Sequence, residues 1–110
     1  MIERVFVDVL KWRRHLHEHP ELSFKEVETS QFIYDTLSQF ENLSLSRPTK
    51  TSVIAKLKGA KPGQVLAMRA DIDALPIREE TGLSFASKNE GIMHACGHDG
   101  HTAMLLGAAK

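Results

Sequence analysis

Residues 64–76 read QVLAMRADIDALP, a stretch in which a predicted strand runs into two carboxylates. The first half, residues 64–70, is a continuous apolar run, which is typical of a strand covered on both faces. Asp71 and Asp73 follow where the run ends, and Pro76 forces a turn. Ligands bind at such strand ends in open α/β sheets. The pair is therefore a candidate binding site, although aspartates in this position are also common turn residues.

The sequence before this stretch predicts a partner strand. Residues 52–58 alternate between apolar and polar side chains, which indicates a half-buried strand. Residues 59–63 read GAKPG, which is typical of a turn. We therefore expect a hairpin that pairs 52–58 with 64–70. Residues 71–97 are rich in glycine, proline and polar side chains and predict irregular structure with short strands.

Three helices are predicted outside this region. Apolar residues recur at helical spacing over residues 2–18, and Pro20 follows the last of them. A second apolar face predicts a helix over 24–41, with Ser23 and Glu26 as a capping box at its start. A third helix is predicted from about His98. It is apolar almost throughout and needs a partner surface, so we expect a truncated or partial chain. The alternative is a short terminal helix that packs on the domain's own sheet.

The densest chemical cluster is residues 93–101, MHACGHDGH. Thiolate and imidazole are preferred ligands of zinc and similar divalent ions, which makes Cys96 and His98 candidate metal ligands. Gly97 between them allows the backbone to bend so that both side chains converge. A free cysteine and solvated loop histidines are the alternative interpretation of so short a motif.

Carboxylates near the cluster are candidates to orient a ligating imidazole, and Asp99 and Asp71 are both available for this. A second group, His15, His17 and His19, lies at the end of the first predicted helix. Residues two apart on a helix do not share a face, so we expect solvated side chains there and no joint metal site.

Composition excludes several classes of protein. The 110 residues carry 14 basic and 14 acidic side chains, so the net charge is zero and gives no electrostatic case for a nucleic-acid or membrane partner. One cysteine cannot form an intrachain disulfide and favours a reducing compartment. The charged first twenty residues exclude a signal-peptide core, and we therefore expect a cytoplasmic protein.

Three long motifs occur in an order that identifies a family. They are HLHEHPELSF at 15–24, MRADIDALPI at 68–77 and MHACGHDGHT at 93–102. Together they resemble the aminoacylase and carboxypeptidase-like metallohydrolases, in the branch of hippurate hydrolase, auxin-amino-acid hydrolase and N-acetyldiaminopimelate deacetylase. The resemblance implies an α/β class, as the N-terminal portion (1–110) of a zinc-exopeptidase-like α/β/α catalytic domain. The remainder of that domain and a dimerisation domain are then absent.

The resemblance also implies a chemistry. The family hydrolyses N-acyl amino acids or short peptides with one or two divalent ions, commonly zinc, manganese or nickel. Cys96 and His98 match its first two metal ligands, and Asp73 matches the catalytic-site carboxylate that supports them. Asp71, Asp99 and His94 are then supporting residues. The full-length protein is expected to act as a homodimer on small molecules.

The family's Glu-Glu pair and further metal-ligand histidines have no counterpart in this sequence, so we expect the 110 residues alone to be inactive. Two other functions stay open. One is a thiol hydrolase with Cys96 as nucleophile and a histidine as base. The other is a non-catalytic metal-binding module.

Overall fold

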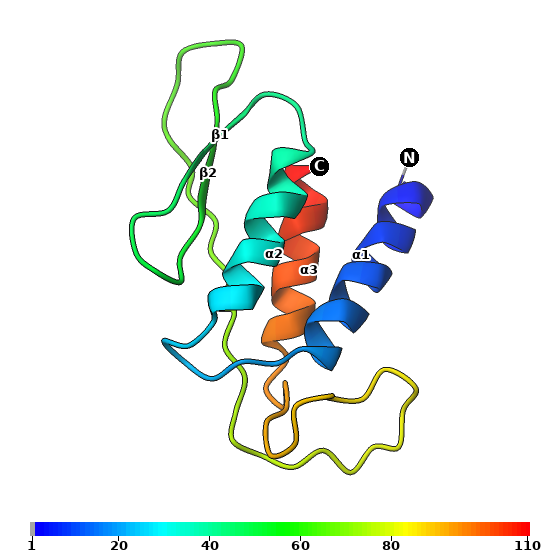
Figure 1. Ribbon diagram of the computed structural model, residues 1–110. Helices are drawn as coiled ribbons and strands as arrows, with labels where there is room; N and C mark the ends of the chain where they lie inside the picture. The colour runs from blue at the N-terminus through cyan, green and yellow to red at the C-terminus, as the bar shows by residue number, and fades with distance from the viewer. Residues whose placement is uncertain (1) are drawn as a thin grey trace.

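Three helices pack side by side, with a two-stranded sheet beside them (Figure 1). The computed structural model describes residues 2–110. In chain order the elements are α1 (Ile2–Glu18), α2 (Val27–Ser38), β1 (Leu43–Ser46), β2 (Ile54–Leu57) and α3 (His98–Ala109). Helix α3 lies between α1 and α2 and contacts both. No helix within residues 2–110 is long and apolar enough to cross a membrane.

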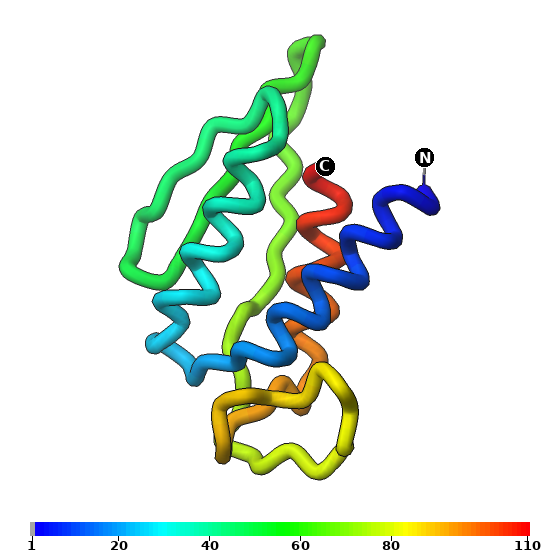
Figure 2. The backbone as a smooth tube through the Cα atoms, turned by 45° about the vertical axis from the view of Figure 1, so that its right-hand side comes forward, coloured from blue at the N-terminus to red at the C-terminus, as the bar shows by residue number. Residues whose placement is uncertain are grey.

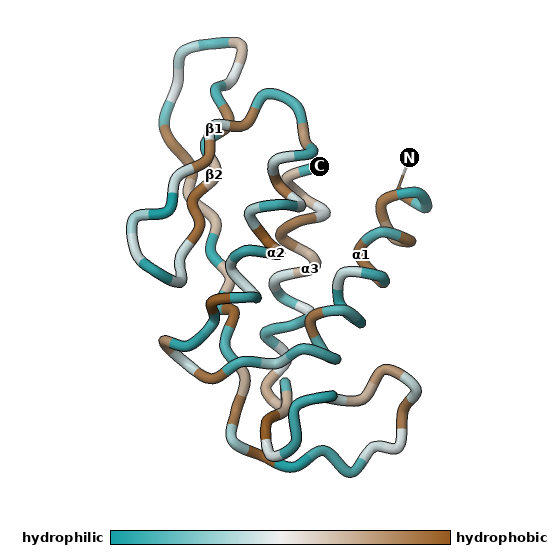
Figure 3. The backbone as a smooth tube through the Cα atoms, viewed as in Figure 1, coloured by the Kyte–Doolittle hydropathy of each residue, from teal (hydrophilic) through white to brown (hydrophobic). Residues whose placement is uncertain are grey.

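Helices α1 and α3 begin where the sequence predicts, and α1 also ends there. A small core joins the three helices: Ile33 and Leu37 of α2 and Leu106 of α3 are buried together, and Trp12 of α1 packs against them. Apolar residues (brown in Figure 3) recur along α1, including its first turn, where Ile2 is 84% exposed. The apolar residues of α1 are thus only partly covered: Ile2 and Phe6 are exposed, whereas Val5 and Val9 are half-buried.

Helix α3 approaches α1 closely at Gly107. A Cβ atom at this position would lie 2.6 Å from Val9 Cγ2 and 3.3 Å from Val5 Cγ1. Distances this short leave no room for a side chain, so the glycine is what allows the two helices to come together. The apolar helix that the sequence left without a partner is therefore packed between its two neighbours.

Helix α2 is shorter than the predicted 24–41, and the predicted capping box is wrong. Glu26 occupies the N-cap position, but no side-chain capping bond forms there. The carboxylate of Glu21 takes over, because it accepts hydrogen bonds from the backbone amide of Thr29 (2.6 Å) and that of Glu28 (3.2 Å). An acidic group at a helix start stabilises the free amides and the helix dipole. A cap from outside the local motif thus sets the start of α2.

The predicted hairpin is also wrong. Strand β2 pairs antiparallel with β1, with Leu43 opposite Leu57, and not with residues 64–70. It is exposed along its length rather than half-buried. Residues 64–70 are stretched out without a ladder partner among residues 2–110, and Val65 is 95% exposed. The pairing changes because Leu43 and Leu45 of β1 pack on the helical core and bring that strand beside β2.

Residues 71–97 are irregular, as predicted, and run past the C-terminal end of α1 and the N-terminal end of α3 (Figure 2). Two isolated bridges fix their course. Ala74 pairs with Leu22, and Leu75 pairs with Met93 in antiparallel fashion. The bridges bring Asp73 and Cys96, far apart in the sequence, to the same end of the molecule.

Candidate metal centre

Cys96 and His98 lie at the start of α3, on either side of its N-cap. Gly97, the N-cap, has φ 104°, a left-handed conformation that side-chain-bearing residues rarely adopt. The bend that the sequence predicts at this glycine is therefore present. The Cys96 thiol is free and exposed.

Asp73 holds the imidazole of His98. Its Oδ1 lies 2.8 Å from His98 Nδ1, and its backbone oxygen lies 3.2 Å from the same nitrogen. Both side chains are about three-quarters buried, at 20% and 27% exposure. Engagement of Nδ1 leaves Nε2 free for a ligand. A carboxylate that accepts from one nitrogen of a histidine while the other binds metal is the usual arrangement around protein zinc.

Asp71 makes a different set of contacts. Its carboxylate accepts a hydrogen bond from Arg69 at 2.7 Å on the exposed surface. That hydrogen bond and the Arg69 charge lower the pKa of Asp71. The backbone oxygen of Asp71 accepts from Thr102 Oγ1 at 3.0 Å, which ties the segment to α3. Of the two strand-end aspartates, it is therefore Asp73 that contacts the candidate ligand.

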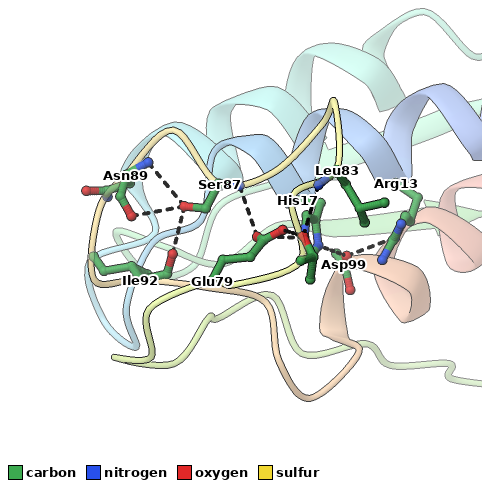
Figure 4. A network of polar contacts seen from close by, with 9 residues as sticks. Arg13, His17, Glu79, Leu83, Ser87, Asn89, Ile92 and Asp99 are labelled. Atoms are coloured by element: carbon green, nitrogen blue, oxygen red, sulfur yellow. Dashed lines mark hydrogen bonds and ion pairs between the residues drawn. The ribbon is translucent and has the colours of Figure 1, made fainter.

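Asp99 turns away from the candidate ligands toward α1. Its Oδ2 accepts from Arg13 Nε at 3.0 Å and lies 2.8 Å from His17 Nδ1 (Figure 4). It does not take the role of orienting His98, which falls to Asp73.

His94 is buried at 5% exposure, and neither of its ring nitrogens has a hydrogen-bond partner among the described residues. Burial lowers its pKa; the charges of Asp99 and Asp73 oppose this shift, and His17 and His98 add to it. The charged groups that act on His94 thus belong both to the candidate site, Asp73 and His98, and to the α1 contacts, Asp99 and His17.

The expectation of a solvated His17 is wrong. The side chain is only 2% exposed, and its Nε2 forms an ion-pair contact of 2.9 Å with Glu79 Oε1 (Figure 4). The sequence shows only that His17 follows Arg13 by four residues and so shares a face of the helix with it; that this face meets α3 is known only from the structure. No local pattern marks Glu79 as its partner.

The donor chemistry fits a divalent ion in part. An exposed thiol and an imidazole with one nitrogen held by a carboxylate are suited to zinc and to similar ions that take sulfur and nitrogen ligands. Within residues 2–110, however, no three His, Cys, Asp or Glu side chains are grouped to hold an ion. A catalytic zinc usually has three protein ligands, so the residues present supply at most part of a site. No hydrogen bond joins Cys96 to a histidine within this range, as a thiol nucleophile would need.

Comparison with known proteins places this site in a family. The family model described as Peptidase family M20/M25/M40 matches residues 67–110, which include Asp73, Cys96 and His98. The chain belongs to peptidase family M20/M25/M40. The resemblance drawn from the three sequence motifs is thereby confirmed.

Relatives of this M20/M25/M40 chain match it over nearly its whole length. An N-acyl-L-amino acid amidohydrolase of Geobacillus stearothermophilus is 66% identical over 110 residues, which are 100% of this chain and 30% of the relative. An N-acetylcysteine deacetylase of Bacillus subtilis is 57% identical over 92% of this chain and 27% of its own. The chain thus spans less than a third of these relatives.

A solved structure matches the fold. The Bacillus subtilis YXEP protein, described as a dinuclear metal-binding peptidase of the M20 family, has a TM-score of 0.92 and 52% identity over 97% of this chain and 30% of its own. The arrangement of helices and small sheet described above is therefore part of the α/β fold of this family, as the sequence predicts.

Proposed function

We propose that the full-length protein is a metal-dependent amidohydrolase that cleaves N-acyl amino acids or short peptides. The observation that carries the proposal is the contact between Asp73 and His98, with the exposed Cys96 thiol two residues before His98. The relatives support the substrate class, since those most similar to this chain include an N-acyl-L-amino acid amidohydrolase and an N-acetylcysteine deacetylase.

Each residue then has a defined task. Cys96 and His98 would bind one divalent ion, and Asp73 would fix the orientation of the His98 ring and raise the basicity of its free nitrogen. A bound ion supplies a water of lowered pKa and polarises the acyl oxygen. Asp71, whose backbone oxygen accepts from Thr102, would tie its segment to α3. Asp99, which contacts Arg13 and His17, and the buried His94 would support the ligands only indirectly.

We propose further that these 110 residues are the N-terminal portion of the catalytic domain and are inactive alone. The general base and the remaining ligands would come from other parts of the protein. Exposed apolar residues at 65, 66 and 68, which the sequence predicts to be covered, support a further layer of protein over this run. We also propose that two copies of the full-length protein associate as a homodimer and that the protein is cytoplasmic.

The donor set bears on the identity of the ions. A thiolate and an imidazole favour zinc or nickel over calcium or magnesium, which prefer oxygen ligands. Manganese is proposed from the family resemblance alone. The YXEP protein, described as dinuclear, supports two ions in the full-length protein.

The test uses Cys96→Ala in the full-length protein. Metal content after reloading with zinc or manganese and the hydrolysis of a panel of N-acetyl and N-benzoyl amino acids are measured for both proteins. We expect the variant to lose metal and activity together, because a ligand is removed. Unchanged metal content would show that Cys96 is not a ligand. Alkylation of Cys96 that proceeds equally fast with and without metal would instead favour a thiol nucleophile.

A further inference from the structure

A buried polar cluster lies beside the candidate metal centre. We define the His17 cluster as His17, Asp99, Glu79 and Arg13 (Figure 4). Three of its side chains are almost fully buried, with His17 and Asp99 at 2% exposure and Glu79 at 4%, and Arg13 is at 35%. His17 is the centre, because one ring nitrogen faces each carboxylate. Both contacts are favourable when the imidazole carries both ring protons.

The three buried members come from three separate parts of the chain. His17 belongs to the last turn of α1, and Asp99 is the second residue of α3, directly after His98. Glu79 lies in the irregular segment that leads to Cys96. A single side chain on α1 therefore reaches both segments that carry the candidate ligands.

The segment on the Glu79 side is closed into a compact loop by polar contacts. The Glu79 carboxylate accepts from the Ser87 amide at 3.0 Å, and Ser87 Oγ donates to the carbonyl of Ile92 at 2.7 Å. Met93 then pairs with Leu75 through two backbone hydrogen bonds of 2.9 Å. These contacts link Glu79 to the backbone at Ile92 and Met93, and Met93 is three residues before Cys96.

The contribution of the His17 cluster to folding stability does not by itself explain why it is present. Removing two carboxylates and an imidazole from water costs free energy, and their mutual attraction offsets this cost only approximately. Apolar side chains of the same size would often give the same folding stability. Such clusters instead hold one geometry, because each partner accepts only certain positions of the others. What this geometry holds in place here is the backbone on both sides of Gly97.

We propose that His17 is a positioning residue for the metal centre: through Asp99 it fixes the start of α3 at His98, and through Glu79 it fixes the segment before Cys96. The proposal rests on the function proposed above. His17 touches neither ion nor substrate, so its effect is on how well Cys96 and His98 converge. Outer partners of metal ligands typically change metal affinity by about 10- to 100-fold.

The test is a cobalt titration of the full-length apoprotein. Cobalt bound to a cysteine thiolate gives a sulfur-to-metal charge-transfer absorption, which reports the Cys96 bond directly. We expect His17→Ala to bind cobalt more weakly by up to about 10-fold, with a weaker or shifted charge-transfer band, because His17 acts on the ligands only through Asp99 and Glu79. His15→Ala is the matched control, since His15 is on the same helix but stacks on Phe32 outside the cluster. It should bind cobalt with the wild-type affinity and spectrum.

Circular dichroism establishes that each variant is folded. A folded His17→Ala protein with the wild-type affinity and band would overturn the positioning role. If His17→Ala does not fold, Glu79→Gln decides, because it keeps the size of the side chain; wild-type affinity and band in that variant overturn the proposal. Absence of the band in the wild-type protein would instead refute Cys96 as a ligand, and with it the proposed function.

Discussion

Removal of the Asp73 carboxylate tests how the candidate ligand His98 is held. In Asp73→Ala the 2.8 Å contact to His98 Nδ1 is lost, and with it the side-chain group that orients the ring. Loss of such an outer contact typically weakens metal binding by about 10- to 100-fold. On the free-energy scale this is about 1.4 to 2.7 kcal/mol.

The structure narrows that range. The backbone oxygen of residue 73, 3.2 Å from His98 Nδ1, survives in the variant and still orients the ring. Both side chains also keep some solvent contact, which weakens the charge interaction. We therefore expect a loss nearer to tenfold, about 1.4 kcal/mol.

The assay is a competition titration of zinc between the full-length protein and a chelator of known affinity. Asp71→Ala is the matched control: the same residue type two positions away, with its carboxylate on Arg69 rather than on His98. We expect wild-type affinity for the control. Equal affinities for Asp73→Ala and the wild type, or an equal loss in both variants, would refute the reasoning.

Two further predictions concern the packing of α3 on α1 and the carboxylate of Glu79. Gly107→Ala should destabilise the protein, because the new Cβ would meet Val9 at 2.6 Å and overpacking costs about 1 to 3 kcal/mol, more than the roughly 1 kcal/mol that alanine gains in a helix. In urea unfolding, Gly100→Ala, with nothing within 4 Å, should leave stability unchanged or raise it; the opposite order of the two variants contradicts the packing of α3 on α1. Burial raises the pKa of Glu79, but hydrogen bonds from Thr81, Ser87 and His17 outweigh it and the net pKa lies below the usual 4.5. The stabilisation that this implies is present above about pH 4.5 and is lost as the pH falls through the lowered pKa. The difference in unfolding free energy between wild type and Glu79→Gln should therefore shrink in acid, and a difference that is constant from pH 7 to pH 3 would contradict it.

The sequence predicts the helices better than the sheet. The helices depend on residues that are neighbours in the sequence, whereas the strand pairing depends on residues far apart in it. In α1 the apolar residues recur at helical spacing, and α3 is a continuous stretch that is apolar almost throughout, so both elements follow from neighbouring residues. The pairing of β2 with β1 depends on Leu43 and Leu45 reaching the core formed by other elements. The start of α2 depends on Glu21, which lies outside the predicted capping motif.

The candidate site shows the same difference between features set by neighbouring residues and features set by residues far apart in the sequence. Cys96 and His98 stand out because their side chains are preferred metal ligands and lie close in the sequence. The predicted strand end marks Asp71 and Asp73 alike, and only the family resemblance singles out Asp73. The role of His17 could not be read in this way, since its partners lie at 79 and 99 and only the folded chain brings them to α1.

X-ray absorption at the zinc edge of the zinc-loaded full-length protein measures the ligands of the ion directly. Coordination by Cys96 predicts one sulfur neighbour at about 2.3 Å beside nitrogen and oxygen neighbours, and the loss of that sulfur in Cys96→Ser. A wild-type spectrum with nitrogen and oxygen neighbours alone would contradict the metal centre described here.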